Sequence, residues 1–337
     1  MVSLKDVARK AGVSASTVSR VMNDSPLISF ETKARVREAI LELNYQPNLS
    51  ARNLRCADTK IIMCMLVSLS NFFMTEFSDC FLGMRDKAAK YGYKVILCPV
   101  ELDRDIEREY LGLVRNSLVD GVIFVNSMLD SDELREIGKT YPCVQCSEYN
   151  EETGIPSTSI NNAQAAMDVV GHLIEIGHRR IGMISSVYRI SSISQREEGY
   201  KQALREAGIP FDPDMIKYGI NEYDSGIEIT NRFLGMDNRP TAIFCISDAI
   251  ARGCAEAAAG SGLRMPEDMA VAGFDNSIMS RLYWPKITTV SQPVYELGGN
   301  AVEQLISIIK GDKDVQDKIV VGHQLIVRES TVKNSAS

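Results

Sequence analysis

The sequence predicts two kinds of structure in one chain: a small all-α head near the amino terminus and a larger α/β body. Three short amphipathic helices within residues 4–44 indicate the head. Apolar, strand-like segments alternate with amphipathic helices from residue 61 onwards, which is the pattern of parallel sheets covered on both faces. Because these strands are too many for one small sheet, we expect two doubly wound parallel-sheet lobes.

The first two predicted helices form a helix-turn-helix pattern between residues 4 and 23. Ser3 stands in the N-cap position and Asp6 follows three residues later, as in a capping box. Gly12 interrupts the helical periodicity where a turn needs a positive φ. Ser14 then caps the second helix, and the inward positions of both helices are apolar. These positions are Val7, Ala8, Ala11, Val18, Val21 and Met22.

The outward face of the second helix consists of hydrogen-bonding side chains with no acidic residue among them: Ser16, Thr17, Ser19 and Arg20. A slim helix with such a face suits the DNA major groove, where an Arg pairs with a guanine edge. A third helix over about 30–44 follows, capped by Ser29, and it completes the head. Val36, Ile40 and Leu43 point inward in this helix, while Lys33, Arg35 and Arg37 point outward.

Charge is unevenly distributed along the chain. Residues 1–60 carry ten Lys and Arg against six Asp and Glu, a net charge of +4. Residues 61–337 carry 27 basic against 38 acidic residues, a net charge of -11. Exposed charges are screened over roughly 8–10 Å at physiological salt, so phosphate would be attracted to the head alone.

Residues 47–58 connect the head to the body. Pro47 ends the third helix and suits the first turn of a new one. The segment 48–55 is too short for a stable isolated helix, so it is either a flexible linker or a helix that forms only against another surface. Leu54 beside Arg52 favours the second alternative, because minor-groove binders unstack a base step with an apolar wedge.

The predicted elements of the body alternate regularly, and we expect crossovers between lobes at Asn161-Asn162, at Thr289–Pro293 and near Val320. The predicted strands are Ile61–Val67, Lys94–Pro99, Gly121–Val125, Cys143–Cys146, Ile181–Ser185, Thr241–Ile246, Ala270–Phe274 and Ile319–Val327. The predicted helices are 75–91, 104–117, 131–139, 162–176, 195–207, 224–235, 248–260 and 295–310.

Several classes of protein are disfavoured. The sequence contains no run of 18 apolar residues and no apolar leader, so we expect a cytoplasmic protein without a membrane span. The eight Cys are interpreted as reduced core thiols, and Cys143 and Cys146 as strand residues rather than metal ligands. No phosphate loop, metalloprotease motif or nucleophile elbow is present, and three His leave little for general-base catalysis. We therefore expect no enzyme, no metal and no cofactor.

Seven motifs in order make the sequence similar to the lactose-repressor (LacI/GalR) family of bacterial transcription regulators. The resemblance covers about residues 3–330. The motifs are Val13-Ser14-Ala15-Ser16-Thr17-Val18-Ser19-Arg20-Val21-Met22-Asn23, Asn44-Tyr45-Gln46-Pro47-Asn48 with Ala51-Arg52-Asn53-Leu54, Ser70-Asn71-Phe72-Phe73, Asp120-Gly121-Val122-Ile123-Phe124, Ile176-Gly177-His178-Arg179-Arg180-Ile181-Gly182, Gly273-Phe274-Asp275-Asn276 and Ile287-Thr288-Thr289-Val290-Ser291-Gln292-Pro293.

This resemblance implies a homodimer with a periplasmic-binding-protein-like clamshell as its body. A helix-turn-helix domain over 1–46 and a hinge helix or linker over 47–58 would precede an effector-binding and dimerisation domain over 59–337. The N-lobe would comprise about 59–160 and 292–320, and the C-lobe about 161–290 and 321–337. A small molecule bound between the lobes would set the affinity for a near-palindromic operator.

The resemblance also assigns DNA contacts. Arg20 matches the base-contacting Arg of the family, against the alternative of a surface Arg paired with a carboxylate. Ala15 and Ser16 occupy the two operator-choosing positions, and both are small. The other expected contacts of the head are Ser14, Thr17, Ser19, Asn23 and Tyr45. In the hinge they are Asn48, Ala51, Arg52 and Leu54, with Leu54 as the minor-groove wedge.

Six residues match effector-binding positions of the family: Phe73, Arg196, Asn221, Asp248, Asp275 and Gln292. Asp275 follows a predicted strand at its carboxyl end, where open parallel sheets bind ligands. The alternatives are an ion pair with Glu197 or Glu198 for Arg196, turn capping for Asp275, helix capping for Asp248 and core packing for Phe73. Asn221 replaces an aromatic residue that stacks on the ligand in many relatives.

The predicted function is therefore a DNA-binding transcriptional regulator, most often a repressor, controlled by a sugar or sugar-like effector. The polar set suits either a polyol or a phosphorylated metabolite. One alternative is a catabolite-control-type regulator with a phosphocarrier protein as co-repressor. In that alternative a basic residue would follow Gly273-Phe274-Asp275-Asn276 closely, but Ile278 and Met279 come before Arg281. A cytoplasmic sugar-binding receptor is a further alternative, and the head argues against it.

Overall fold

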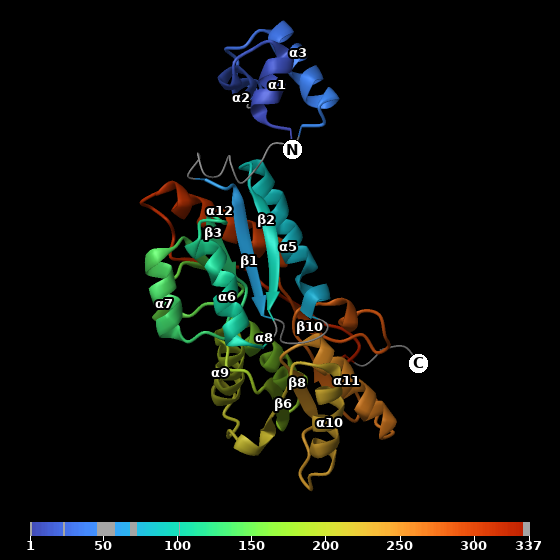
Figure 1. The fold of residues 1–337 in the computed structure, drawn as a ribbon. Helices are drawn as coiled ribbons and strands as arrows, with labels where there is room; N and C mark the ends of the chain where they lie inside the picture. The colour runs from blue at the N-terminus through green and yellow to red at the C-terminus, as the bar shows by residue number, and fades with distance from the viewer. Residues whose placement is uncertain (1, 23, 46–57, 68–72, 101, 333–337) are drawn as a thin grey trace. The chain divides into compact units, whose positions relative to one another are not determined.

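A computed structural model describes residues 2–22, 24–45, 58–67, 73–100 and 102–332. The chain forms two compact units, Met1–Thr59 and Lys60–Ser337 (Figure 1). Asn23 and the expected hinge residues Asn48, Ala51, Arg52 and Leu54 lie outside the described residues. Within the described part of the chain, no helix combines the length and apolar character that a membrane span needs.

The first unit contains the three expected helices, α1 (Leu4–Ala11), α2 (Ala15–Met22) and α3 (Phe30–Glu42). The capping box of Ser3 and Asp6 is present, and Gly12 ends α1 with φ 65°. The Thr17 amide donates to Ser14 Oγ at 3.1 Å, and the Thr32 amide donates to Ser29 Oγ at 3.3 Å. The predicted helix starts are therefore confirmed, although α3 ends two residues earlier than expected.

A small apolar core holds the three head helices together. Val7, Val18 and Val36 are fully buried in it, one from each helix. Arg35 of α3 adds a hydrogen bond to this packing. Its Nη2 donates at 2.6 Å to the carbonyl of Ala11, the last residue of α1. Such a core keeps α2 in place while its outward face stays exposed.

The second unit begins with a six-stranded parallel sheet, the N-lobe sheet. In spatial order its strands are β11 (Lys318–Val321), β5 (Ser157–Ile160), β4 (Cys143–Cys146), β3 (Gly121–Phe124), β1 (Ile61–Val67) and β2 (Lys94–Val100). Four helices pack on it: α5 (Phe73–Lys90), α6 (Arg104–Arg115), α7 (Ser131–Thr140) and α12 (Val294–Lys310).

The alternation of side chains in β1 explains why its sequence is apolar throughout. Ile62, Cys64 and Leu66 join the core formed with α5 and α12. Met63 and Met65 point to the other face and join the core formed with α6 and α7. A strand that is buried on both faces needs no polar alternation, as the apolar pattern predicted.

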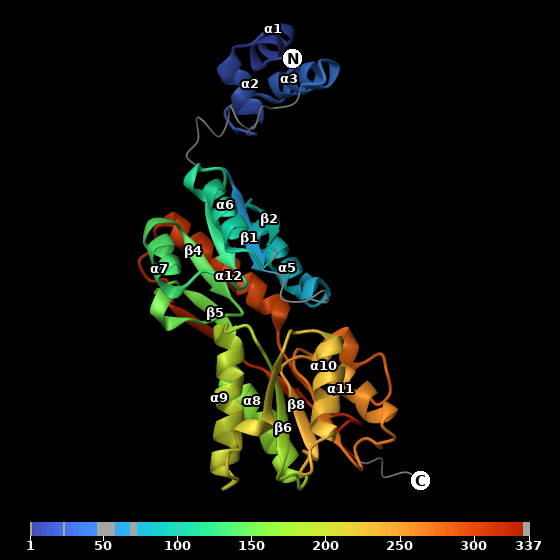
Figure 2. The ribbon, with the colours of Figure 1, turned by 60° about the horizontal axis from the view of Figure 1, so that its bottom comes forward.

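The C-lobe sheet is also parallel, with four strands in the order β7 (Ile216–Gly219), β6 (Ile181–Ser186), β8 (Ala242–Cys245) and β9 (Ala270–Ala272). Helices α8 (Asn162–Glu175) and α9 (Ser191–Glu206) cover one face of this sheet. Helices α10 (Tyr223–Leu234) and α11 (Asp248–Gly260) cover the other face (Figure 2). The expectation of two doubly wound lobes is confirmed.

Two short strands, β10 (Thr289–Ser291) and β12 (Gln324–Ile326), form a separate antiparallel pair. The prediction of one strand over Ile319–Val327 was therefore wrong. That segment is divided between β11 of the N-lobe sheet and β12, with a break at Gly322 and His323. β5, β7 and β10 were not predicted, because they are only three or four residues long and carry Ser, Thr, Lys and Gly among few aliphatic residues.

Gly199 positions α9 against α8. A Cβ at this position would overlap the Ala163 carbonyl oxygen and would lie 2.9 Å from the Ala166 Cβ. The close approach brings Arg196, one turn earlier on α9, within hydrogen-bonding distance of Asn162 at the start of α8. Packing of the two helices and the position of Arg196 thus depend on the same glycine.

We expect Gly199→Ala to lower the free energy of unfolding by about 1–3 kcal/mol, because the added methyl group cannot be accommodated without moving α8. Gly171→Ala is the matched control, since its Cβ would meet nothing within 4 Å. In a helix interior that change should be neutral or stabilising by up to about 1 kcal/mol. Urea unfolding followed by circular dichroism measures both. Equal effects of the two variants would contradict the packing argument.

Candidate DNA-contact face and interlobe cavity

The outward face of α2 presents the expected polar side chains. Ser16, Ser19 and Arg20 are exposed, and Ser14 Oγ lies 2.7 Å from Ser16 Oγ and 2.8 Å from Thr17 Oγ1. Ala15 is half-buried and packs on the head core, so Ser16 is the more accessible of the two positions that the family resemblance assigns to operator choice. Tyr45 is also half-buried against this core.

Arg20 differs from Arg9, Lys10, Lys33 and Arg37 of the head, which all form ion pairs. Lys33 and Arg37 both contact Asp24, at 2.9 and 3.3 Å, and Arg9 lies 3.4 Å from Asp6. None of the ion pairs found within the described head residues includes Arg20. The geometry therefore offers no support for the alternative of a surface ion pair, and the guanidinium is available to a ligand.

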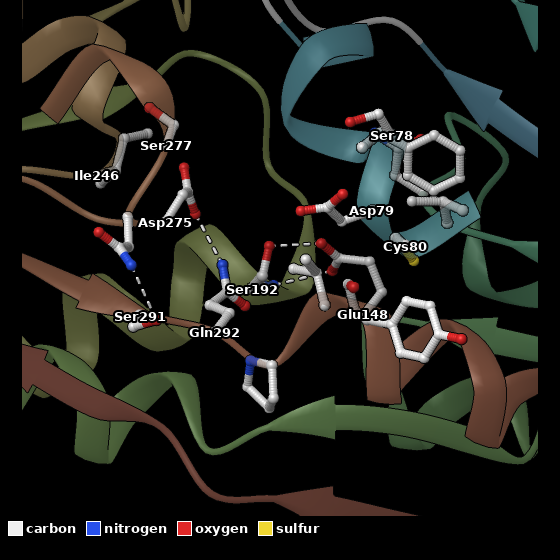
Figure 3. Close-up of a pocket in the computed structure, with 18 of the residues that line it drawn as sticks. Ser78, Asp79, Cys80, Glu148, Ser192, Ile246, Asp275, Ser277, Ser291 and Gln292 are labelled. Atoms are coloured by element: carbon white, nitrogen blue, oxygen red, sulfur yellow. Dashed lines mark hydrogen bonds between the residues drawn. The ribbon is translucent and has the colours of Figure 1, made fainter. Parts of the chain in front are cut away.

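The second unit contains a cavity of about 780 Å³ lined by both lobes. The N-lobe contributes side chains from α5 and from the ends of β3 and β4, including Asp79, Asn126 and Glu148. The C-lobe contributes the start of α9 and the loop after β9, and the segment 291–296 completes the wall. Figure 3 shows polar side chains from these segments around one space.

Arg196 is held at the cavity wall by several contacts and is only 9% exposed. Its Nε donates to Asn162 Oδ1 at 3.0 Å, and its Nη1 donates to the Ile246 carbonyl at 2.7 Å. The guanidinium stacks over the Phe274 ring, with Cζ 3.6 Å from the ring centroid. In the ion pairs of the described residues, Glu197 and Glu198 contact other arginines. The alternative prediction, an exposed ion pair between Arg196 and Glu197 or Glu198, therefore does not describe Arg196.

Asp275 lies at the carboxyl end of β9 with a φ of 102°. Residues with positive φ that are not glycine are uncommon and cluster at functional sites. Its Oδ1 accepts from Gln292 Nε2 at 2.7 Å (Figure 3). The same oxygen lies 3.8 Å from Arg196 Nη1. Burial raises the pKa of the Asp275 carboxyl group, while Arg196 and the hydrogen bond from Gln292 oppose this rise. Three of the expected residues thus meet at one point.

Asp248 does not line the cavity, which differs from the expected effector contact. It is fully buried behind the wall, where its Oδ2 accepts from the Ser277 amide at 2.6 Å. Ser247, not Asp248, is the N-cap of α11. Burial and the nearby Asp275 carboxylate raise the pKa of Asp248 to about 8. Asp248 therefore supports the loop that carries Asp275 and Ser277 from behind.

Asn221 lines the cavity, and its Oδ1 accepts from the Ser247 hydroxyl. Phe73 is the first residue of α5, and its side chain lies outside the described part of the structure. The described side chains contain no group of three or more His, Cys, Asp or Glu residues arranged to hold a metal ion. The seven described Cys are free and buried, and burial raises the pKa of Cys143 to about 12.

Glu148 is a cavity residue that sequence reasoning missed, and it joins the two lobes. It follows β4 of the N-lobe, and its Oε2 accepts from the Ser192 amide at 2.9 Å in the first turn of α9 (Figure 3). The hydroxyl groups of Ser191 and Ser192 donate to the same carboxylate. Burial raises the pKa of Glu148, while these hydrogen bonds oppose the rise. The rule applied to Asp275, a polar residue after a buried strand, would have found Glu148 as well.

Comparisons with known proteins agree with this architecture. Residues 3–48 match the model described as bacterial regulatory proteins, lacI family, and residues 170–331 match the periplasmic binding protein-like domain. The chain is 37% identical over 332 residues to the HTH-type transcriptional regulator RegA of Clostridium saccharobutylicum, with 98% of this chain and 99% of that protein covered. Catabolite control protein A of Priestia megaterium is 34% identical over 332 residues, with the same coverage.

A solved structure of the lac repressor dimer, bound to operator and the anti-inducer ONPF, superimposes with a TM-score of 0.89 and 27% identity. The superposition covers 98% of this chain and 99% of the repressor chain. The α2 face, the two-lobed body and these matches define a DNA-binding transcriptional regulator. The chain belongs to the lacI family of bacterial regulatory proteins.

The raised pKa of Asp248 makes a pH-dependent contribution to stability. Because the folded-state pKa of about 8 lies above the ordinary value of 3.8, the folded chain holds this proton more tightly. The stabilising contribution is complete below pH of about 4 and is lost as the pH rises through 8. We expect Asp248→Asn to gain stability relative to the wild type as the pH rises from 5 to 9, by at most about 1.4 kcal/mol per pH unit.

Urea unfolding at pH 5, 7 and 9 measures this difference. Asp268→Asn is the control, because Arg264 holds the pKa of Asp268 below its usual range. Its effect on stability should be unchanged across these pH values. A pH-independent difference between Asp248→Asn and the wild type would show that Asp248 is ionised throughout.

Proposed function

We propose that this regulator binds its operator through the α2 face and that a polyhydroxylated small molecule in the interlobe cavity controls the binding. The observation that carries the proposal is the meeting of Arg196, Asp275 and Gln292 at the wall of a cavity lined by both lobes. A ligand that contacts both lobes stabilises the lobe arrangement in which both sets of contacts are made. A regulatory ligand must bind one arrangement of the lobes more tightly than another, and contacts with both lobes allow this.

The DNA side of the proposal rests on the exposed Arg20 and the hydroxyl groups beside it. Arg20 would read a guanine edge, and Ser14, Thr17, Ser19 and Tyr45 would contact phosphates, which position the head without reading sequence. By family resemblance, the 47–58 segments of two protomers would fold in the minor groove, with Leu54 as the wedge. Folding of the hinge and binding of the operator would then be coupled.

We further propose that the working form is a homodimer that acts in the cytoplasm and has no catalytic activity. The relatives reported above are named as regulators, and the lac repressor match is a dimer on its operator. The similarity to a catabolite control protein keeps a phosphocarrier co-repressor as the alternative. Control by a small molecule and control by a phosphocarrier protein are distinguished by measuring operator binding with a purified phosphorylated phosphocarrier protein in place of sugars. Tighter binding with the phosphocarrier alone would favour the alternative.

Arg20→Ala should remove discrimination at one operator base pair and leave non-specific DNA binding nearly intact. A bidentate contact with guanine is worth roughly 1–3 kcal/mol of discrimination. Titration of operator and single-base variants by fluorescence anisotropy gives the affinities. Arg9→Ala, which removes the same charge from exposed α1, is the control and should weaken all sequences equally. An equal loss on all sequences for Arg20→Ala would assign it to phosphate instead.

Asp275→Asn should leave folding and effector-free operator binding unchanged and abolish the response to the effector. Asn tolerates a positive φ as Asp does, so the backbone is preserved, whereas the charge facing Arg196 is lost. A thermal-shift screen of sugars on the wild type identifies the effector. Operator binding with and without it then measures the response. A variant with a wild-type response would remove Asp275 from the proposed site.

A further inference from the structure

We propose that the interlobe cavity selects ligands without an anionic group: it accepts a neutral or amino-substituted polyol and rejects the corresponding phosphate ester, with Glu148 as a specificity-determining residue. This inference rests on the proposed function of the cavity and names the chemical class of its ligand. It decides between the two classes, polyol and phosphorylated metabolite, that the sequence left open.

The charges on the cavity wall are the first observation. Among the residues that the structure describes, four carboxylates line the cavity, from Asp79, Glu148, Asp275 and Glu296, against the two guanidinium groups of Arg196 and Arg281. Figure 3 shows Asp79, Glu148 and Asp275 around the same space. A phosphate group in that space would lie among groups of its own sign, whereas an ammonium group would be attracted.

The second observation concerns Arg196, which is more buried than Arg281, the other cation of the described lining. Its Nη1 lies 3.8 Å from the Asp275 carboxylate and 2.7 Å from the Ile246 carbonyl oxygen. A ligand phosphate that approached this guanidinium would therefore also approach Asp275. The positive charge is offset by the protein itself, so Arg196 serves to orient Asp275 and to bind neutral hydroxyl groups rather than to hold an anion.

The third observation is that a carboxyl group of the chain itself, that of Glu148, already occupies the amino terminus of α9. Helix amino termini are where proteins commonly bind phosphate, because their free amides and dipole attract anions. At α9, the Glu148 carboxylate accepts from the Ser192 amide at 2.9 Å. Glu148 thus takes the place that a phosphate would need beside the cavity.

What remains at the wall suits hydroxyl groups and carbon–hydrogen faces. Asn126, Ser192 and Asn221 add neutral polar groups, and Phe77, Ile193 and Ile246 add apolar surface. A mainly apolar wall with a few placed polar groups is what small-molecule sites present. Acceptor-rich walls of this kind pair with ligands that are rich in hydroxyl or amine donors.

The test uses matched triplets of hexoses on the full-length protein: the parent sugar, its 2-amino-2-deoxy derivative and its 6-phosphate, for glucose, galactose and mannose. Thermal-shift titration gives the apparent Kd of each. In the triplet that binds, we expect the phosphate to bind at least tenfold more weakly than the parent and the amine to bind as well or better. A phosphate that binds as tightly as the parent overturns the inference. If no sugar in any form shifts the melting temperature, the proposed carbohydrate effector fails instead.

Glu148→Gln tests the role of this residue while preserving its shape. The variant should improve binding of the phosphate ester relative to the parent sugar by about tenfold, since the negative charge leaves the start of α9. Glu198→Gln is the matched control, because Glu198 lies on α9 itself but is exposed and paired with Arg205 at 3.1 Å. It should leave the ratio of the two Kd values unchanged.

Asp79→Asn provides an independent variant, because Asp79 is exposed on α5 and its change should not impair folding. It should shift the same ratio in the same direction as Glu148→Gln. If neither variant changes the ratio of phosphate to parent Kd, the carboxylates do not select the ligand and the inference is wrong.

Discussion

The position of Asp275 depends on one constraint, the hydrogen bonding between the loop after β9 and β10. β10 is the strand that leads the chain back to the N-lobe. The Asp275 amide donates to the Val290 carbonyl at 2.9 Å, which holds the loop after β9 against β10. That contact places the carboxylate opposite Gln292 and beside Arg196. The strained φ of 102° is maintained because β10, α9 and the buried Asp248 support the loop from three sides.

Glu148 also connects the two lobes, through hydrogen bonds to its side chain. It reaches from the N-lobe to the first turn of α9, so the same carboxylate bonds the C-lobe and lines the cavity. A change in lobe arrangement would have to alter these hydrogen bonds. The residues that would contact a ligand are thus also residues that join the lobes, which links occupancy of the cavity to the shape of the body.

Much of the architecture could be predicted because local patterns carry it. The caps at Ser3, Ser14 and Ser29 and the fully apolar β1 needed no tertiary information. The strand over Ile319–Val327 failed because periodicity does not show that one apolar segment serves two sheets. For Asp248, which begins a helix after a strand, ligand contact and helix capping were both open predictions. Only packing shows that it faces Ser277 behind the wall.

The sequence by itself determined the helix-turn-helix head, the alternating α/β body and the family, since each depends on residue types at short spacings. Only the tertiary structure decided the character of the cavity, because Glu148, Arg196, Asp275 and Gln292 are far apart in the chain and meet through α9, β4 and β10. Charge in a cleft is a property of side chains brought together by folding. The spacing of residues along the chain therefore left polyol and phosphate open, and our proposal of a polyol rests on the charges that the two lobes bring together.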